Sequence, residues 1–453
     1  MKYRIFRFLL KTFLNLKLYA FVGIMVIRLA EELDSIPLRD KDKKTIKDRF
    51  LKKFYSGEPS IILFNKTGLL EDLNAIREFA SLDDVEFPKV FIIPRYVINL
   101  IAEHFLSEDQ RYDFHSPTEL EAVDSRKLEL FWKVVLTQLK SKWNSRMIIS
   151  ANYTYGNERD AQKAGVEIGL KVVILYKECF MSVRHSEDLI KVLKKSRRFY
   201  GTRMLLYNQG EMERQLSSGM ATRSQLVVTG SPRFDAYLRN ATKAVSFDNA
   251  KIVFFVHDFV TEANKGKFAD AQDAFDVYSN KVIPFGLELM IKAARKFPAI
   301  SFEIKVKITK STQEFVDLWT RKVEFPPNIS LAKGGLAQDS LKNCIGALGF
   351  NTTALVDAMA SGIPVAVLNL VDAQDKLEGY KINYGPGSTE VSSYLEFQDW
   401  INLILTEKDA FGNINQSISM ANNQFLLEAI GNNDGGSSRR ALSEILLEFK
   451  EHK

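Results

Sequence analysis

The segment Ile345–Leu370 constrains the fold of this chain most strongly, because it contains a complete strand–helix–strand unit. An apolar run ends at Phe350 and is followed by the polar triplet Asn351-Thr352-Thr353. An amphipathic helix follows and stops at Gly362-Ile363-Pro364, where a second apolar strand begins. This order predicts one βαβ unit with parallel strands. The free N–H groups at the helix start would form the positive end of a helix dipole, which favours a phosphate.

The same alternation of apolar strands and amphipathic helices runs through nearly the whole chain. The strands expected in the first half are Ser60–Phe64, Val90–Ile93, Met147–Ser150, Lys171–Tyr176, Met204–Tyr207 and Gln225–Val228. The strands expected in the second half are Ile252–Val256, Ser301–Val306, Ile345–Gly349 and Val365–Leu368. Strands that alternate with helices in this way are typical of parallel sheets. We predict an α/β fold of two doubly wound, Rossmann-like domains that face a central cleft, where ligands bind at the carboxyl ends of the strands.

The length of 453 residues exceeds one ordinary core and favours two domains of roughly 200 residues each. The polar segment Leu238–Ala250 has no strong periodicity and places the boundary near residue 245. The predicted parts are a basic amphipathic N-terminal helix (1–30), a first Rossmann-like domain (31–245) and a second one with terminal helices (246–453). Helices are also expected at Thr312–Arg321, Asn415–Ile430 and Ser437–Lys450.

Composition narrows the class of protein. Hydrophobic residues make up 46% and charged residues 26%, as in ordinary globular proteins. The net charge of +6 suits an anionic substrate or an anionic membrane surface. This charge is too diffuse for nucleic acid, and we find neither Cys-His zinc spacing nor an aromatic and basic RNA-binding pattern, so nucleic acid is not an expected partner. The two cysteines, Cys179 and Cys344, lie among apolar residues and are expected to be buried thiols in a reducing compartment.

The N-terminus combines basic residues with an uncharged run, Leu18–Ile27. Ten uncharged residues are too few to cross a bilayer, which needs about 20, and no small-residue cleavage site follows. One interpretation is a basic helix that rests on the cytoplasmic leaflet. The other is a helix that packs on the first domain. The residues alone favour neither.

Several side chains that can carry chemistry directly follow predicted strands. Glu178 and Asp235 could form a carboxylate pair, in which one group transfers a proton and the other attacks a sugar. The structural alternative pairs Glu178 with a nearby lysine and places Asp235 in a helix N-terminal turn. In that alternative Ser231 caps the turn, and Pro232 is its first residue.

The second half supplies cations and a helix start. His257 follows a strand and could act as an acid–base group or phosphate donor, or could be a structural residue. Lys305 and Lys307 share one face of their strand and could neutralise a phosphate or a sugar carboxylate, or could be a solvated sheet edge. Capping explains one residue of the Asn351–Thr353 triplet but not all of them, which favours a phosphate site. Asp357 lies one helical turn beyond Thr353, where it could contact a ribose hydroxyl or solvent. No plausible Asp-x-Asp lies between a strand and a loop, so no metal ion or other cofactor is expected.

At Gly349–Pro364, GFNTTALVDAMASGIP, the chain resembles the nucleotide-binding motif of GT-B glycosyltransferases. This motif is shared with glycerophosphotransferases, sugar-nucleotide epimerases and Kdo transferases. Tyr176-Lys-Glu178 and Thr229-Gly-Ser-Pro-Arg-Phe-Asp235 look like segments of the retaining β-Kdo transferases of bacterial surface polysaccharide assembly. Asp357 and Lys305-Val-Lys307 depart from that pattern, where Glu and a Lys-Pro-His-Pro-like run are common.

The resemblance implies a metal-independent transferase that moves Kdo from CMP-Kdo to a glycan or lipid-linked glycan with retention. Asp235 would form the covalent intermediate, Glu178 would be the acid/base, and His257 would act beside them. The residues implied for donor binding are Ser231, Arg233, Lys305, Lys307, Asn351, Thr352, Thr353 and Asp357. The first domain would be catalytic and the second would bind the nucleotide sugar, in the cytoplasm and peripheral to the inner membrane.

The residues leave three other functions open. One is a polyol-phosphate transferase that uses CDP-glycerol or CDP-ribitol, and the second is a GT-B transferase with another nucleotide sugar as donor. The third is a non-catalytic assembly partner that keeps the fold.

Overall fold

The computed structural model of the chain describes residues 2–29, 31–32, 57–107, 110–111, 119–180, 182–194, 198–240, 249–257, 271–307, 319, 323–370, 373–377, 379, 381–406 and 423–450. The predicted helix Thr312–Arg321 lies outside these residues except for Trp319, and the first half of Asn415–Ile430 also lies outside them.

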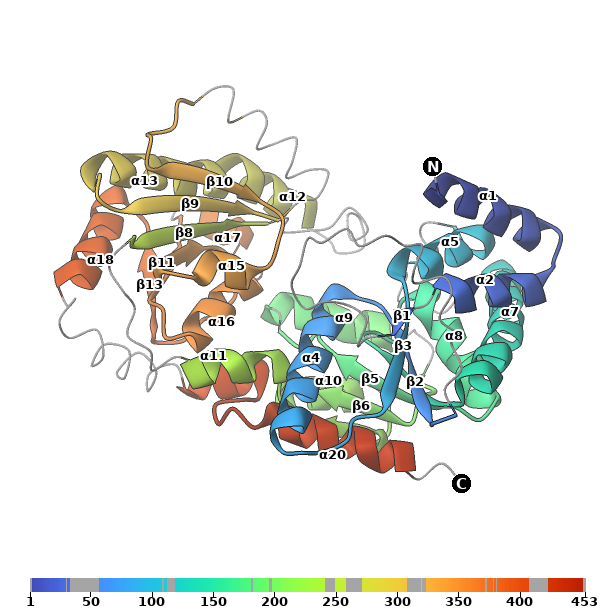
Figure 1. The fold of residues 1–453 in the computed structure, drawn as a ribbon. Coiled ribbons are helices and arrows are strands. Elements are labelled where there is room, and N and C mark those ends of the chain that lie inside the picture. Colours follow the sequence, from blue (N-terminus) through green and yellow to red (C-terminus); the bar gives the residue numbers. More distant parts are fainter. Residues whose placement is uncertain are drawn as a thin grey trace. The chain divides into compact units, whose positions relative to one another are not determined.

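The chain divides into two compact units, and the division differs from the predicted one (Figure 1). Unit 1 comprises Met1–Cys179, Leu189–Arg233 and Gly436–Lys453, and unit 2 comprises Phe180–Asp188 and Phe234–Gly435. The main boundary therefore lies at Arg233 and Phe234, before the predicted position near residue 245. The last helix, predicted as part of the second domain, belongs to unit 1.

Unit 1 contains a seven-stranded sheet in the order β1-β3-β2-β4-β5-β6-β7. Its strands are β1 (Glu31–Glu32), β2 (Ser60–Phe64), β3 (Lys89–Ile93), β4 (Ser145–Ser150), β5 (Lys171–Tyr176), β6 (Arg203–Leu206) and β7 (Leu226–Val228). Only the short β1 pairs antiparallel, and all other pairs in this sheet are parallel. From β2 the chain goes outward to β3 and then crosses to β4, so the direction of winding reverses between β2 and β4.

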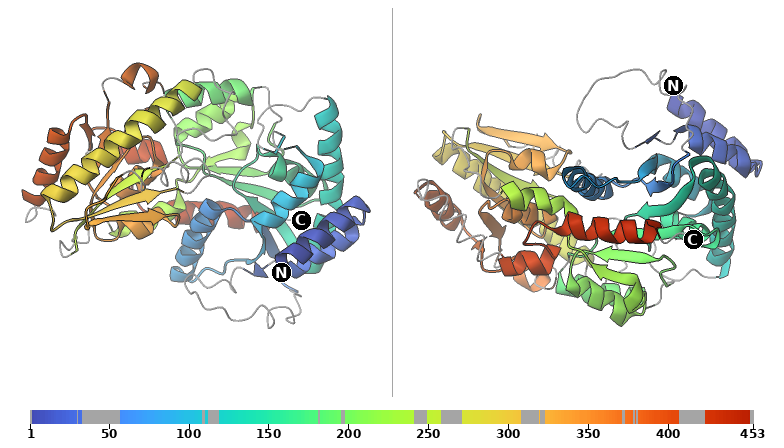
Figure 2. Two further views of the ribbon diagram at one scale, coloured as in Figure 1. Left: turned by 90° about the horizontal axis from the view of Figure 1, so that it is seen from above. Right: turned by 60° about the horizontal axis from the view of Figure 1, so that its bottom comes forward.

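Helices cover both faces of this sheet, because its strands are apolar on both sides. Ile62 and Phe64 of β2 face one core, while Ile61 and Leu63 face the other. The helices on the first side are α1 (Lys2–Asn15), α2 (Tyr19–Leu29), α5 (Arg95–Phe105), α7 (Glu119–Trp143), α8 (Gly156–Glu167) and α10 (Gln209–Ser218). The second side is covered by α4 (Thr67–Leu82) and the C-terminal α20 (Ser437–Lys450). In the right view of Figure 2 the red helix α20 lies across the front of unit 1, far along the sequence from the green segments beside it.

Salt bridges and core contacts tie α20 to unit 1. Ile445 has no exposed surface and lies in the core with α4. The buried Glu448 carboxylate lies 2.8 Å from Arg203 Nε and 3.4 Å from Lys171 Nζ, on two strands of the sheet. Arg440 Nε donates to the Thr229 carbonyl at 2.8 Å. These contacts explain why the last helix is not part of the second unit.

Unit 2 contains a six-stranded, entirely parallel sheet in the order β10-β9-β8-β11-β12-β13. Its strands are β8 (Lys251–Val256), β9 (Ser301–Val306), β10 (Ile329–Lys333), β11 (Cys344–Gly349), β12 (Val365–Leu368) and β13 (Ser388–Val391). Its helices include α11 (Asp235–Asn240), α12 (Ala271–Val277), α13 (Ile283–Lys296), α15 (Ala337–Leu341), α16 (Thr353–Ala360), α17 (Gln374–Leu377) and α18 (Tyr394–Thr406). α9 (Val183–Leu193) runs from unit 2 into unit 1.

Each unit is thus a doubly wound, Rossmann-like α/β layer structure, which confirms the predicted fold class and the two-part composition of a GT-B fold. Unit 2 follows the classic strand order, with its winding reversed between β8 and β11. Cys179 and Cys344 are buried and free, as predicted.

The N-terminal region is a pair of helices rather than the single predicted helix. α2 packs on α7 and α1 packs on α5, with Leu10, Leu14, Val22 and Val26 buried in the core of unit 1. One face of this region is therefore structural. Among the described residues, no helix is long and apolar enough to cross a membrane.

Candidate functional site

The first candidate site lies in unit 2, at the carboxyl ends of β9, β8 and β11. In doubly wound sheets ligands bind where the winding reverses, here between β8 and β11. The residue after β8 is His257, and Asn351 and Thr352 soon follow β11. Lys307 directly follows β9, and its backbone N–H bonds the Val256 carbonyl at 2.9 Å. Parallel neighbours thus bring a histidine, a lysine and a helix start to one edge.

His257 is held neutral at this edge. Burial and, to a smaller extent, the positive charge of Lys307 lower the pKa of His257 to about 3, against the opposite effect of a hydrogen bond with the Asn351 backbone. The Tyr278 hydroxyl lies 3.4 Å from His257 Nδ1. A neutral imidazole can accept a proton or a hydrogen bond at one nitrogen while it donates from the other. The nearby Lys307 supplies the positive charge that His257 lacks.

The turn before α16 forms a capped helix start. Asn351 adopts a left-handed backbone with φ of 50°, which asparagine tolerates better than most residues. Thr352 is the N-cap, and its hydroxyl accepts from the Ala354 N–H at 3.3 Å. Asn351 Oδ1 is buried and forms no hydrogen bond within the described part of the chain. Thr353 is exposed at the first helical position.

Two predicted donor-binding residues are turned toward the protein itself. Lys305 is 9% exposed, and its ammonium donates to the carbonyl of Gly334 after the neighbouring strand β10. Asp357 is also 9% exposed, within α16. Lys307, in contrast, is exposed. The lysine pair therefore divides into a bound, structural Lys305 and an accessible Lys307.

A polar cavity of about 280 Å³ lies close to this helix start. Its lining residues include Lys381, Asn383, Tyr384, Ser388 and Glu390. The Tyr384 hydroxyl donates to the carbonyl of the N-cap residue Thr352 at 2.9 Å. The cavity is near the lower end of the usual size range for small-molecule sites. It offers room for part of a ligand whose anionic group would lie at the start of α16.

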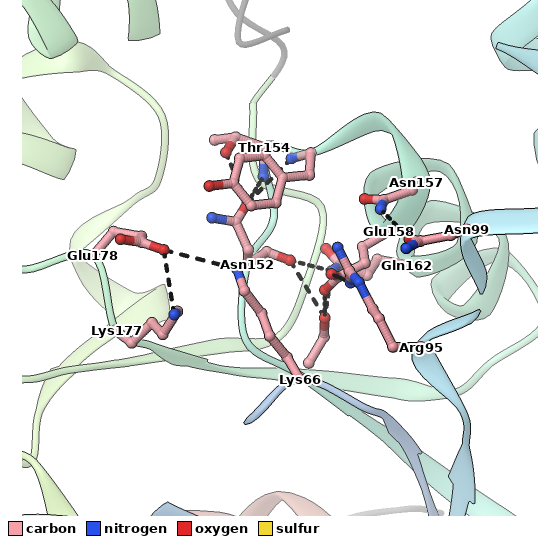
Figure 3. Close-up of polar contacts among 12 residues, drawn as sticks. Lys66, Arg95, Asn99, Asn152, Thr154, Asn157, Glu158, Gln162, Lys177 and Glu178 are labelled. Carbon is pink, nitrogen blue, oxygen red and sulfur yellow. Dashed lines mark hydrogen bonds and ion pairs between the residues drawn. The ribbon is translucent and has the colours of Figure 1, made fainter. Parts of the chain in front are cut away.

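The second candidate site lies in unit 1, where the winding reverses between β2 and β4 (Figure 3). Lys66 follows β2, the loop 151–155 follows β4, and Lys177 and Glu178 follow β5. Figure 3 shows Lys66 and Lys177 directed toward Glu178 from two different strands. Their ammonium groups lie 3.7 and 3.8 Å from Glu178 Oε1. The Glu178 side chain is 39% exposed, so it can reach a ligand.

Lys66 is the most unusual group of this second site. Its Nζ is buried and has no hydrogen-bond partner within the described residues, although it lies 4.6 Å from the centre of the Tyr155 ring. Burial lowers the pKa of Lys66, and the Glu178 carboxylate partly restores it. Lys66 is also the N-cap residue of α4, which has no side-chain cap. A buried ammonium beside a half-exposed carboxylate is an arrangement suited to proton transfer.

A buried hydrogen-bond network holds the loop of this site in place. Asn152 has no exposed surface, and its Oδ1 accepts from the Thr154 N–H and hydroxyl at 2.7 Å each. The buried Glu158 pairs with Arg95 and accepts a short hydrogen bond from Ser150. Asn152 Nδ2 is buried without a hydrogen bond in the described part of the chain. The network fixes the backbone and leaves one donor group unused.

The remaining predicted residues lie at the start of α11 and in the turn before it. Asp235 has no exposed surface, and Asn432 Nδ2 donates to its Oδ1 at 2.5 Å. Arg233 donates from its backbone N–H to Asp72 at 3.1 Å and lies near Glu71. Ser231 is fully buried. This geometry agrees with the structural alternative for Asp235, because a nucleophile needs access to its substrate.

The structure thus brings together one group of predicted residues. His257, Lys307 and Asn351–Thr352 meet in unit 2, whereas Glu178 lies with unpredicted partners in unit 1, and Asp235 belongs to unit 2. Sequence reasoning missed Lys66, Asn152 and Glu158. The rule that examines residues after each strand would have found the first two of these, had it been applied to β2 and β4. The described residues contain no group of histidine, cysteine or carboxylate side chains that could hold a metal ion.

No protein-family model matches the sequence. A search of curated proteins finds no match either. Similar solved structures are UDP-GlcNAc 2-epimerases: that of Neisseria meningitidis bound to UDP-GlcNAc has 14% identity, a TM-score of 0.49, and coverage of 86% of this chain and 100% of that chain. The enzyme of Methanocaldococcus jannaschii has 12% identity, a TM-score of 0.49 and coverage of 86% and 99%. Anabaena HepE in complex with UDP and glucose has 12% identity, a TM-score of 0.43 and coverage of 86% and 99%.

These findings contradict the expected function. Where Kdo transferases were expected, the similar structures are UDP-GlcNAc 2-epimerases, so the assignment of Kdo transfer from CMP-Kdo was wrong. The covalent intermediate on Asp235 is withdrawn with it. At such low identities, and with TM-scores below 0.5, these structures do not in turn assign a reaction to this chain.

Proposed function

We propose that this protein is an enzyme that binds a nucleotide sugar through its phosphates at the carboxyl end of the unit 2 sheet. The observation that carries this proposal is the meeting of Lys307, neutral His257 and the start of α16 where the winding reverses. An exposed ammonium and the positive end of a helix dipole attract phosphate oxygens without a metal ion. The adjacent cavity would take part of the nucleoside.

The second site, within unit 1, carries groups that are suited to proton transfer. The Glu178 carboxylate can accept or return a proton of a sugar hydroxyl, and the Lys66 ammonium can stabilise negative charge that develops on oxygen. Asn152 Nδ2 adds a buried donor for a hydroxyl or carbonyl oxygen. Donors beside an acceptor match the hydroxyl groups of a sugar, each of which donates and accepts.

Calorimetric titration of the full-length protein tests nucleotide binding. UDP and UDP-GlcNAc are the first probes, and CMP and inorganic phosphate complete the series. We expect Lys307→Gln to weaken the binding of the preferred nucleotide roughly tenfold or more, because a charge-assisted hydrogen bond is lost. Lys292→Gln is the matched control, since Lys292 is an exposed lysine on α13 that pairs with Glu288. The absence of binding by every nucleotide would instead favour a non-catalytic scaffold.

Turnover of the nucleotide sugar that binds best tests the second site. Product analysis by NMR distinguishes release of the nucleotide from a change in the sugar that remains attached. Glu178→Gln should lower turnover roughly a hundredfold or more, as expected for a lost proton-transfer group, and nucleotide affinity should persist. Turnover that survives in both Glu178→Gln and Lys66→Met would remove the catalytic assignment of this site.

A further inference from the structure

The N-terminal hairpin, which comprises α1, α2 and the turn between them, exposes large apolar side chains on the face opposite the core. Phe8 is 69% exposed and Leu16 62% on the first helix and turn, and Phe21 is 52% exposed on the second helix. Leu9, Leu18 and Ile24 are also exposed. Along α1, Phe8 and Lys11 alternate at helical spacing with the buried Leu10 and Leu14. Each helix is therefore apolar on both sides, and only one side meets unit 1.

The turn is held rigidly by its backbone. Lys17 adopts a left-handed conformation with φ of 55°. Its N–H bonds the Leu14 carbonyl at 3.0 Å, and the Leu18 N–H bonds the Phe13 carbonyl at 2.9 Å, which closes α1 as in a Schellman motif. The Phe13 and Phe21 rings stack across the two helices at 5.7 Å. The hairpin thus presents Leu16, Lys17 and Leu18 at a fixed tip.

The charge of this segment is entirely positive. The first acidic residue of the chain is Glu31, and before it stand six basic residues: Lys2, Arg4, Arg7, Lys11, Lys17 and Arg28. These equal the net charge of the whole chain, +6, so the rest of the sequence carries as many acidic as basic residues. A positive segment with exposed aromatic and aliphatic side chains complements an anionic lipid surface.

We propose that the N-terminal hairpin docks the protein on the surface of an anionic phospholipid bilayer. Phe8, Leu16 and Phe21 would enter the interface between headgroups and acyl chains, while Lys11 and Lys17 would pair with lipid phosphates. The hairpin would lie on the bilayer and not cross it, because α2 has 11 residues. The inference does not depend on the reaction that the protein catalyses.

Vesicle flotation with the full-length protein tests the proposal. We expect binding to vesicles of phosphatidylcholine with phosphatidylglycerol, little binding to phosphatidylcholine alone, and release as salt rises. Lys11→Glu with Lys17→Glu should weaken binding roughly tenfold or more. Phe8→Ser with Phe21→Ser should also release the protein. Leu395→Ser with Leu403→Ser is the control, because these α18 leucines are 65% and 54% exposed outside the hairpin.

A second measurement covers the case in which a variant folds poorly. In Phe21→Trp, the fluorescence of the new indole should shift to shorter wavelength when anionic vesicles are added, while Leu395→Trp should show no shift. Hairpin variants that bind vesicles as the wild type does would overturn the proposal. So would a dimer in analytical ultracentrifugation that the Phe8 and Phe21 substitutions dissociate, because a second copy would then cover this face.

Discussion

At the scale of single residues, environment decides which titratable groups can act. His257 and Lys66 both lose basicity because burial penalises their charged forms. Glu178 keeps access to solvent between two lysines, whereas Asp235 is enclosed and bonded to Asn432. Both members of the predicted pair carry a carboxylate, but their surroundings in the structure differ.

The depressed pKa of His257 has a consequence for stability. In the unfolded chain this histidine takes up a proton below its ordinary pKa of about 6.5, but in the folded chain only below about 3. The unfolded state therefore binds more protons in this window, and the residue makes stability fall as the pH drops from 6.5 toward 3. We expect His257→Gln to lose less stability between pH 7 and pH 5 than the wild type, measured by urea unfolding. Equal losses in both proteins would contradict the assigned burial.

At the scale of elements, close packing of helices on strands fixes the position of the sites. Gly286 of α13 lies against the Phe254 ring of β8, the strand that directly precedes His257. A Cβ atom at position 286 would be only 2.4 Å from Phe254 Cζ. The absent side chain therefore sets how closely α13 approaches the central strand of unit 2.

Gly286→Ala should destabilise the protein by about 1–2 kcal/mol, because the overpacking penalty exceeds the gain in helix propensity. Urea unfolding measures the change. Gly210→Ala in α10 is the matched control, since its nearest contact would be Asn208 Oδ1 at 3.6 Å, and we expect no loss there. A stable Gly286→Ala variant would show that the ring of Phe254 can move aside.

At the scale of the whole molecule, the C-terminal segment Gly436–Lys453 belongs to unit 1, which also contains the N-terminus. α20 covers one face of the unit 1 sheet beside α4, and its Glu448 carboxylate forms ion pairs with Lys171 and Arg203. Removal of only one partner from such a buried ion pair leaves a charge without its counterion, which is costly. The last helix thus completes unit 1, although the unit 2 segment Phe234–Gly435 separates it in the sequence from the strands that it covers.

Ile445→Ala tests this arrangement. The fully buried side chain leaves a cavity on truncation, which costs about 2–5 kcal/mol. Hydrogen exchange should become faster in β2 and α4 of unit 1 and stay unchanged in unit 2. Ile404→Ala in α18, a buried position of unit 2, should show the reverse pattern. Faster exchange in unit 2 for Ile445→Ala would contradict the assignment of α20 to unit 1.

Much of the fold could be read from local patterns. β2, β5, β9, β12 and α20 have the predicted bounds, because strands buried on both faces are continuously apolar and helices alternate between them. The strands β1, β10 and β13 were missed. All three lie at sheet edges, and in β10 and β13 partial exposure removes the apolar signal. The rule on strand ends also placed His257 and the start of α16 together.

The sequence by itself determined that parallel sheets form, and which residues follow their strands, since side-chain periodicity and strand length are local properties. Only the tertiary structure decided that Lys66 faces Glu178, that Lys305 bonds to Gly334, and that α20 belongs to unit 1. These outcomes depend on strand order and on burial by segments far away in the chain. Such contacts join residues that are far apart in the sequence, so no short segment of the chain determines them.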